Sequence, residues 1–227
     1  MVGSASAAPV LMAHRTPRDG VGSRDVMPPE VLCRFGLLVD PRFWGTDECA
    51  RVCADMATSE GGPATLLEAD GRSTIDPDVR RTRLVSVSAG SRDLIQASFG
   101  ALRPRLERHF GLALHAWQPP QCLVYSAGGH YVPHADSATG PRVGTVLQAR
   151  KISVILFLND HAEAAGPDVY GGGVLTFWGL FGDSRLNGHG LPVSGHAGLL
   201  IAFPSHLTHE VETVTHGVRY TVVGWFV

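Results

Sequence analysis

Two segments in the first half of the chain have the apolar spacing of amphipathic helices. In Thr46–Thr58, apolar side chains recur every three or four positions from Cys49 to Met56, which places them on one face of a helix. A second segment shows the same repeat, starting at Ser91, a residue type that caps helix N-termini, and ending at about Phe110. The pattern therefore predicts a helix in each segment.

The segments around these helices follow other patterns. Residues 31–39 alternate loosely between apolar and polar side chains, as a strand does. Residues 61–78 are polar and are interrupted by Gly and Pro, as a loop is. Residues 1–29 are rich in Ser, Ala, Pro, Gly and Arg and have no apolar repeat, so we expect them to form a flexible N-terminal arm.

From residue 113 onward the chain is divided into short β-like runs by Gly, Pro, Asn and Asp. Many short strands separated by turn residues indicate a β-sandwich or barrel. Helices followed by antiparallel strands make the predicted fold class α+β, mainly β, with a jelly-roll core. The predicted strands are Ala113–Trp117, Gln121–Ser126, Lys151–Leu158, Gly173–Trp178, Gly190–Val193, Gly198–Phe203, His209–Val214 and Tyr220–Phe226.

The length and charge of the chain set limits on its organisation and partners. A chain of 227 residues can form one domain with a sizeable core. We predict a single domain over 30–227, with a helical support region at 30–112 and a β core at 113–227. The formal net charge of −2 gives no basis for expecting a nucleic-acid partner. Because the sequence has neither a bilayer-length apolar stretch nor a secretory signal pattern, we expect a cytoplasmic location and no membrane partner.

The candidate chemistry begins with a histidine and an aspartate two positions apart, His134 and Asp136. In an extended segment such residues point to the same face, so an imidazole and a carboxylate lie side by side. The pair alone is weak evidence, because the chain has 11 histidines and chance pairs are common. A metal site also needs a third ligand from elsewhere in the chain.

His209 and His206 are the two candidates for that third ligand. We favour His209, because the apolar run that ends at Phe203 is followed by a turn, and His209 then starts the next strand, where its direction is fixed. Two imidazoles and one carboxylate on one side of a metal form the facial triad of non-haem Fe(II) oxygenases, which leaves other coordination positions open.

An arginine follows within the same β region, at Arg219. Oxygenases of this type obtain electrons from 2-oxoglutarate, which loses CO2, and the far carboxylate of this molecule needs a cationic anchor. A planar guanidinium binds a carboxylate through two parallel hydrogen bonds, better than lysine does. An arginine buried in a strand would also be costly without such a partner. Arg219 is therefore the predicted anchor.

The order of these residues resembles a known family, the prolyl 4-hydroxylase-like branch of the Fe(II)/2-oxoglutarate-dependent dioxygenases. The segments Ile152–Asn159 and Gly171–Phe177 also resemble two strands of that family, the second led by glycines. The similarity covers residues 120–227 well and residues 30–110 only in general layout. The residues that carry the pattern are Tyr125, Tyr131, His134, Asp136, His209, Arg219 and Trp225.

The resemblance implies a double-stranded β-helix (jelly roll) core with N-terminal supporting helices. It also implies Fe(II) as the cofactor and 2-oxoglutarate and O2 as cosubstrates, with ascorbate as an optional reductant. The implied roles are metal binding for His134, Asp136 and His209, 2-oxoglutarate binding for Arg219 and Tyr125, and substrate contact for Tyr131 and Trp225.

Two positions depart from the family pattern. Phe157 stands where relatives often have a tyrosine that supports the far carboxylate, and Val223 stands where they often have a threonine. Both changes remove a hydroxyl donor. We therefore expect the cosubstrate to depend more on Arg219 and on another donor, such as Tyr125 or Ser153.

The implied reaction is hydroxylation of an unactivated C–H bond, coupled to decarboxylation of 2-oxoglutarate to succinate and CO2. Asp136 fills the position that a halide would need, so halogenation is disfavoured. For the substrate we favour a small molecule or amino acid derivative, because the chain is short and has no peptide-binding domain. The alternative substrate is a prolyl residue in a peptide or protein. A cupin-like metal-binding protein without oxygenase activity is less favoured, since the His-x-His arrangement is absent from the sequence.

A basic cluster, Arg80, Arg81 and Arg83, follows the expected loop. The simpler interpretation is a solvated face of the protein. The sharper one is contact with an acidic group of the substrate. Sequence alone leaves both open, and it leaves the oligomeric state open as well.

Overall fold

The computed structural model describes residues 26–68, 70–140, 143–182 and 188–227. Of the expected N-terminal arm, residues 1–25 therefore lie outside the described residues. At the end of this arm, the Met27 backbone N–H donates to the Pro192 carbonyl at 2.9 Å, and Met27 forms an isolated bridge with Val193. Residues just before the predicted domain are thus joined to its β region.

The helix predicted over Thr46–Thr58 is confirmed, and its buried residues Cys49, Val52 and Met56 have the helical spacing. The second helix is also present, but the predicted cap is wrong. Ser88 caps it, because the Ser88 side chain accepts a hydrogen bond from the Ser91 backbone N–H at 3.4 Å. The described helices are η1 (Pro29–Phe35), α1 (Thr46–Thr58), α2 (Ala89–Phe110) and α3 (Thr145–Ala149).

The strand predicted over residues 31–39 is wrong for most of its length. The segment forms η1, a 3-10 helix whose first position is Pro29, a residue with a backbone angle suited to a helix start. The helix ends at Gly36, which adopts a φ of 78° that favours glycine. Only the last residues of the segment belong to a strand, β1, which pairs with β14.

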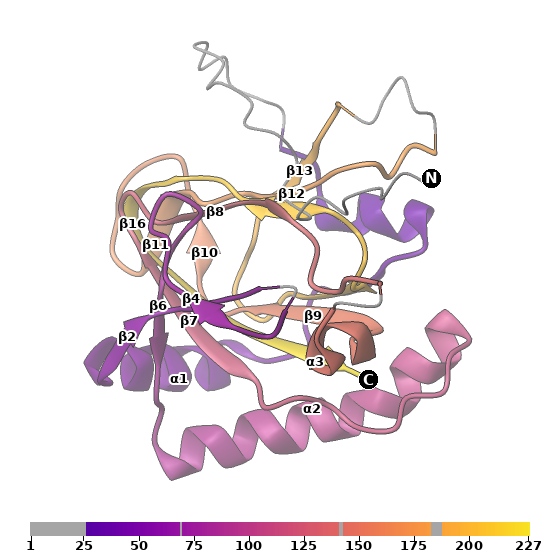
Figure 1. Ribbon diagram of the computed structural model, residues 1–227. Coiled ribbons are helices and arrows are strands. Elements are labelled where there is room, and N and C mark those ends of the chain that lie inside the picture. The colour runs from indigo at the N-terminus through magenta and orange to yellow at the C-terminus, as the bar shows by residue number, and fades with distance from the viewer. Residues whose placement is uncertain (1–25, 69, 141–142, 183–187) are drawn as a thin grey trace, which may run out of the picture.

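The strands form two main sheets (Figure 1). The larger has nine strands, with the order β1-β14-β9-β16-β7-β6-β2 and with β10 and β11 attached beside this path. The smaller has five strands, in the order β13-β12-β15-β8-β5. The bounds are β1 (Leu38–Asp40), β2 (Gly61–Pro63), β3 (Leu66–Leu67), β4 (Ser73–Thr74), β5 (Arg80–Arg81), β6 (Arg83–Val85), β7 (Gln121–Ser126), β8 (His130–His134), β9 (Ile152–Phe157), β10 (Asp160–His161), β11 (Val169–Gly172), β12 (Leu175–Phe177), β13 (Leu191–Val193), β14 (Leu200–Pro204), β15 (His209–Val211) and β16 (Val214–Phe226).

The expected loop over residues 61–78 contains short strands. β2 extends the larger sheet by pairing with β6, and β3 and β4 pair only with each other, as a separate hairpin. Each of these strands has two or three residues, too few for alternation to stand out in a segment rich in Gly and polar residues. We call β3 and β4 with the turn between them the β3–β4 hairpin.

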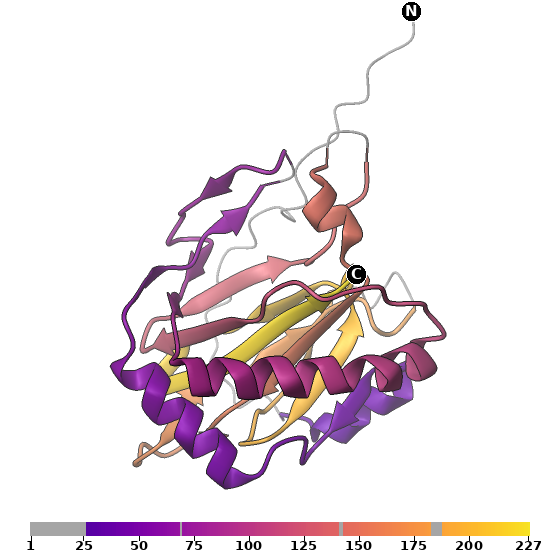
Figure 2. The same cartoon turned by 90° about the horizontal axis from the view of Figure 1, so that it is seen from below.

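Helices α1 and α2 lie across one face of the larger sheet (Figure 2). An apolar cluster joins them to that face, for example through Phe99, Val154 and Val222. A second cluster, which includes Phe157 and Phe177, fills the space between the larger and smaller sheets. Two facing sheets with helices on one side confirm the predicted jelly roll of mainly β structure. None of the helices in the described part of the chain has the length and apolar character needed to cross a membrane.

The long strand β16 connects the core to the cavity between the sheets. It pairs with β7 on one side and with β9 on the other, so its register is fixed along most of its length. Its even-numbered residues from Val218 to Val222 belong to the helix-side cluster, whereas its odd-numbered residues from Arg219 to Trp225 line the cavity. This alternation is the two-residue repeat of a strand, and it directs Arg219 into the cavity.

Candidate active site

His134, Asp136 and His209 meet at one end of the smaller sheet. His134 ends β8, His209 starts β15, and these two residues are directly paired in the antiparallel register. Nε2 of His134 lies 3.8 Å from Oδ1 of Asp136, and Nε2 of His209 lies 3.6 Å from Oδ2 of Asp136. One ligand atom from each residue lies within 4.8 Å of the others. Among the described residues, this is the group of His, Cys, Asp and Glu side chains that could hold a metal ion.

Hydrogen bonds to the backbone fix both imidazole rings. Nδ1 of His134 lies 2.9 Å from the Val132 carbonyl, and Nδ1 of His209 lies 3.0 Å from the Leu207 carbonyl. Because a carbonyl only accepts, each Nδ1–H is the donor, and each Nε2 presents its lone pair to the other ligands. Burial, followed by the effect of His209, lowers the pKa of His134 to about 3, so this ring is neutral and able to bind a metal.

The Asp136 carboxylate is held by its own set of contacts. Ser153 Oγ donates to Oδ2 of Asp136 at 2.7 Å, and the Asp136 backbone N–H donates to the Ser205 carbonyl at 2.9 Å. Burial raises the pKa of Asp136, but His209, His134 and the Ser153 hydroxyl outweigh it, and the net pKa lies below its usual value. The carboxylate is therefore ionised and oriented toward the two imidazoles.

The rival ligand His206 is exposed, whereas His209 is 4% exposed and packs edge-on against Phe203 at 4.7 Å between ring centroids. His206 is not part of the cluster that could bind a metal. The argument from strand position is therefore supported by the structure, since a side chain at a strand start is directed by its pairing and one in the preceding turn is not.

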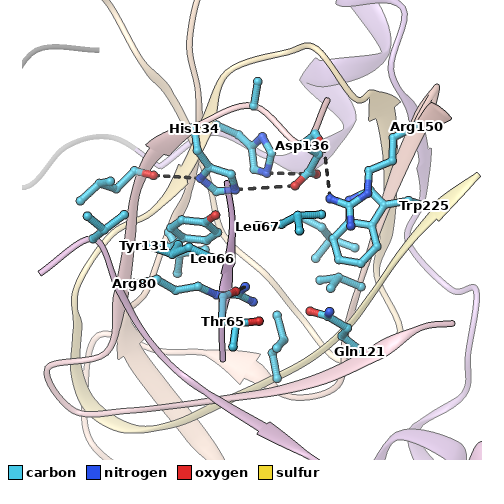
Figure 3. Close-up of a pocket in the computed structure, with 18 of the residues that line it drawn as sticks. Thr65, Leu66, Leu67, Arg80, Gln121, Tyr131, His134, Asp136, Arg150 and Trp225 are labelled. Atoms are coloured by element: carbon cyan, nitrogen blue, oxygen red, sulfur yellow. Dashed lines mark hydrogen bonds and ion pairs between the residues drawn. The ribbon is translucent and has the colours of Figure 1, made fainter. Parts of the chain in front are cut away.

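The three residues border a cavity of about 340 Å³ (Figure 3). All seven residues that carried the sequence pattern line this one cavity, although they come from β7, β8, β15, β16 and the turn after β8. Tyr131 stacks on the His134 ring with centroids 3.5 Å apart, and Tyr125 lies beneath the Arg219 guanidinium, 5.2 Å from its carbon. Ser153 is absent from the lining, because it points to Asp136.

Arg219 is the unusual group in this cavity. It is 1% exposed, and its one hydrogen bond is from Nη1 to Thr221 Oγ1 at 3.4 Å. Its Nε and Nη2 atoms are buried and have no partner among the described residues. A buried guanidinium without a carboxylate is costly, so the cavity is built for an anion at this position. Thr221, which was not predicted, supplies a hydroxyl two residues from the place where Val223 lacks one.

Two other cavity residues, Arg150 and Gln121, were missed from the sequence, and the role of Arg80 was left open there. Arg150 lies over the Trp225 ring at 3.7 Å from its centroid, and its Nη1 donates to the Asp136 carbonyl at 3.2 Å. Arg80 lies over the Tyr131 ring at 4.8 Å from its centroid. Gln121 borders the same cavity. The basic cluster gave a signal for Arg80, but no local pattern separates Arg150 or Gln121 from ordinary surface residues.

Comparison with known proteins agrees with this arrangement. Residues 120–227 match the family model described as the 2OG-Fe(II) oxygenase superfamily. A PKHD-type hydroxylase of Pseudomonas putida is 29% identical over 194 residues, which cover 83% of this chain and 77% of that protein. A PKHD-type hydroxylase of Pseudomonas fluorescens is 32% identical, but that match covers only 49% of this chain and 44% of the relative.

Solved structures share the fold. A prolyl-4-hydroxylase of Pseudomonas putida has a TM-score of 0.61 and 21% identity, and the match covers 87% of this chain and 95% of that one. A prolyl hydroxylase of Trichoplax adhaerens, in complex with a hypoxia inducible factor oxygen degradation domain peptide fragment, has a TM-score of 0.66 and 16% identity, with 87% and 86% covered.

A jelly roll with a His-x-Asp pair, a distant histidine and a buried arginine around one cavity defines the class of non-haem iron oxygenases. The family match over residues 120–227, the PKHD-type hydroxylase relatives and the fold shared with prolyl-4-hydroxylase structures support a 2OG-Fe(II) oxygenase that is prolyl 4-hydroxylase-like. The predicted resemblance is confirmed. The family implies Fe(II), 2-oxoglutarate and O2.

Proposed function

We propose that this protein hydroxylates an unactivated C–H bond of a small acidic molecule, such as an amino acid derivative, in a reaction that converts 2-oxoglutarate to succinate and CO2. The observation that carries the proposal is the buried, unpaired guanidinium of Arg219 in the same cavity as His134, Asp136 and His209. A metal triad alone fits several classes of protein. A metal triad with a carboxylate anchor beside it fits a 2-oxo acid that also carries a second carboxylate.

The residues present fit both groups. Two imidazole nitrogens and one carboxylate oxygen are the donor set that non-haem Fe(II) oxygenases use, and we assign iron binding to His134, Asp136 and His209. We assign the far carboxylate of 2-oxoglutarate to Arg219, with Thr221 and Tyr125 beside it. When bound at the iron, 2-oxoglutarate would supply two of the four electrons that reduce O2 and be oxidised to succinate and CO2, and the C–H bond of the substrate would supply the other two.

The protein side chains orient the reactants and exclude water. Ser153 holds the Asp136 carboxylate in one direction, and the two backbone carbonyls hold the imidazole rings. Phe177 and Phe203 pack around His209 on the side away from the cavity. Together these contacts would let a metal bind to the three side chains with little rearrangement.

The substrate class is inferred from Arg80 and Arg150. Their side chains enter the cavity from opposite sides (Figure 3), and among the described residues no carboxylate forms an ion pair with either. Arg80 also has a buried Nε without a partner, and Gln121 has a buried, unpartnered Oε1. The two guanidinium groups match a carboxylate on the ligand, and the free Gln121 Oε1 matches an N–H or O–H donor on the same ligand.

The second candidate is a prolyl hydroxylase that acts on a peptide or protein. It is favoured by the similarity in fold to the Trichoplax adhaerens enzyme that was solved with a peptide fragment. The guanidinium groups of Arg80 and Arg150 would then bind backbone carbonyls instead of a carboxylate. The two candidates differ in whether a free carboxylate on the substrate is required.

The test measures succinate released with Fe(II), 2-oxoglutarate, ascorbate and O2. The panel contains free amino acids with a proline set among them, the carboxamide of each, and a prolyl peptide blocked at both ends. We expect free acids to raise the rate above the substrate-free rate, and their carboxamides to do so much less. A response to the blocked peptide alone would favour the second candidate. No succinate above an His134→Ala control would contradict oxygenase activity altogether. A role for ascorbate and a cytoplasmic location stay predictions.

A further inference from the structure

The side chain of Tyr170, on β11, has no role in the site described so far. It is 0% exposed, and its hydroxyl has no hydrogen-bond partner among the described residues. The ring lies 5.9 Å from the Arg219 guanidinium carbon and packs edge-on against His161. A buried hydroxyl without a partner costs free energy. Its position beside a guanidinium that has two unpartnered nitrogens therefore needs a physical explanation.

Two glycines bring the Tyr170 hydroxyl and Arg219 together. A Cβ atom at Gly195 would lie 2.6 Å from the Tyr170 hydroxyl and 2.1 Å from Cδ1 of Phe157. A Cβ atom at Gly173 would lie 3.0 Å from Cδ of Arg219 and 3.4 Å from Cδ2 of Tyr170. The group formed by Phe157, Tyr170 and Arg219 therefore has no spare space, and the hydroxyl is held at a defined place.

The pairing of β11 with β16 explains why Tyr170 reaches this place. Tyr170 is opposite Gly217, which lies on the same face of β16 as Arg219, two residues further along. Gly217 has no side chain to occupy the space between them. Burial raises the pKa of Tyr170, and Arg219 is the strongest of the groups that act against this increase. The guanidinium is thus the main electrostatic neighbour of the hydroxyl.

The hydrogen-bond needs of the two groups are complementary. A guanidinium has five N–H donors and no acceptor, whereas a phenol oxygen can accept and can also donate its own proton. Thr221 Oγ1 satisfies one donor of Arg219, while Nε and Nη2 remain without acceptors. Phe157, whose ring lies 4.9 Å from the guanidinium carbon, offers no hydroxyl. Tyr170 therefore carries the aromatic hydroxyl that is available to Arg219 on this side.

We infer that Tyr170 is a positioning residue for Arg219, whose hydroxyl supports the guanidinium from outside the cavity and keeps it directed at the far carboxylate of 2-oxoglutarate. This inference rests on the proposed function, which assigns Arg219 to that carboxylate. Tyr170 does not line the cavity, so its effect passes through Arg219. Loss of the hydroxyl should weaken recognition of the far carboxylate and leave chelation at the metal unchanged.

The test compares two 2-oxo acids on the Zn(II)-loaded protein by calorimetry. 2-Oxoglutarate has the far carboxylate and pyruvate lacks it, while both present the same keto acid to the metal. We expect Tyr170→Phe to weaken 2-oxoglutarate binding roughly tenfold, the scale of one hydrogen bond to a charged group. Pyruvate binding should change less than about twofold in the same variant. The matched control is Tyr220→Phe, one residue from Arg219 but on the helix-side face of β16.

A double variant, Tyr170→Phe with Phe157→Tyr, tests whether the hydroxyl itself matters. It moves the hydroxyl from β11 to β9 beside the same guanidinium, and we expect it to restore part of the lost affinity. Thermal unfolding without ligand should change little in Tyr170→Phe, since the substitution removes one hydroxyl and keeps the buried ring. Only the stabilisation gained on adding 2-oxoglutarate should be smaller.

Three results separate this inference from the proposed function. An equal loss of 2-oxoglutarate and pyruvate binding in Tyr170→Phe would show general disruption and overturn the inference. No loss of either would also overturn it, while the proposed function would stand if the unaltered protein still prefers 2-oxoglutarate. An unaltered protein that binds both acids equally would overturn the role of Arg219, and with it both proposals.

Discussion

The cavity has two walls that differ in how they are built. The inner wall, His134, Asp136, His209 and Arg219, is carried by β8, β15 and β16, whose pairing fixes the direction of each side chain. The outer wall, Leu66, Leu67, Arg80 and Arg150, comes from the β3–β4 hairpin, the short strand β5 and the turn after α3. A strand that is paired on both sides fixes the direction of its side chains, whereas a two-residue strand that is paired on one side fixes it less.

This difference indicates that the two walls have different roles in the reaction. On the inner wall, hydrogen bonds to the rest of the chain fix the three candidate metal ligands. Arg219, in contrast, keeps two nitrogens without a partner among the described residues, where a ligand could accept hydrogen bonds. On the outer wall, the β3–β4 hairpin pairs only with itself, and within it the Thr74 hydroxyl donates to the Glu68 carboxylate at 2.8 Å. We expect the inner wall to determine the type of reaction and the outer wall to determine the substrate. Substitutions in each wall should therefore have different consequences.

The largest effect is expected from removing a metal ligand of the inner wall. His209→Ala should lower the affinity for Fe(II) more than about 100-fold, because loss of a residue that only supports a ligand already costs roughly 10–100-fold. The matched control is His206→Ala, which alters an exposed histidine three residues away. Anaerobic Fe(II) titration checks the pair. Comparable losses in both variants would refute the choice of His209.

The next largest effect is expected at the other end of the inner wall. Arg219→Ala should raise the amount of 2-oxoglutarate needed for half-maximal activity roughly 100-fold, since removing one partner of a buried charge pair is costly. The requirement for Fe(II) should change far less. Arg219→Lys should recover only part of the loss, because lysine keeps the charge but not the planar fork. A parallel loss of iron and 2-oxoglutarate affinity would count against the assigned role.

A smaller effect is expected from the residue behind Asp136. Ser153→Ala removes the hydroxyl that donates to Oδ2 of Asp136, and it should weaken Fe(II) binding roughly tenfold. Binding of 2-oxoglutarate to the metal-loaded protein should be nearly unchanged, because Ser153 does not line the cavity. The alternative expectation, that Ser153 is a donor for the cosubstrate, predicts the opposite order of effects. Separate titrations of metal and cosubstrate distinguish the two.

The smallest effect is expected from the outer wall. Arg80→Gln should weaken the response to an acidic substrate roughly fivefold, the scale of a partly exposed ion pair, and should leave the response to its carboxamide unchanged. The control is Arg81→Gln, the exposed neighbour on the same strand β5. The measurement is succinate release against substrate concentration. Equal losses for acid and amide would show that Arg80 does not distinguish charge, and would remove the contrast between the walls.

The sequence allowed most of the inner wall to be predicted, because local spacing indicated single residues and the order of the whole set resembled a known family. His134 and Asp136 are two residues apart in a strand and its turn, and Arg219 is part of a long apolar run with a regular repeat. The jelly roll followed from the many short strands. Even so, the strand expected over residues 31–39 is mostly a 3-10 helix, since proline and glycine at its ends determine its backbone more than its apolar pattern does.

Residues brought together only by tertiary structure could not be found in this way. Tyr170 and Arg219 are 49 residues apart in the sequence, and only the pairing of β11 with β16 brings them together. Arg150 reaches Trp225 from a turn that has no regular pattern. Thr221 is one hydroxyl in a mostly apolar strand, and its direction into the cavity depends on the pairing of β16 with β7 and β9. The strands of the β3–β4 hairpin are too short for their alternation to be recognised.

Binding of iron and 2-oxoglutarate together in one cavity is tested most directly by anaerobic visible absorbance. Adding 2-oxoglutarate to the Fe(II)-loaded protein should produce an absorbance band that neither component gives alone. The band should be lost in His134→Ala and should require far more 2-oxoglutarate in Arg219→Ala. If the unaltered protein gives no band, or if His134→Ala gives the same band, the proposed site is contradicted.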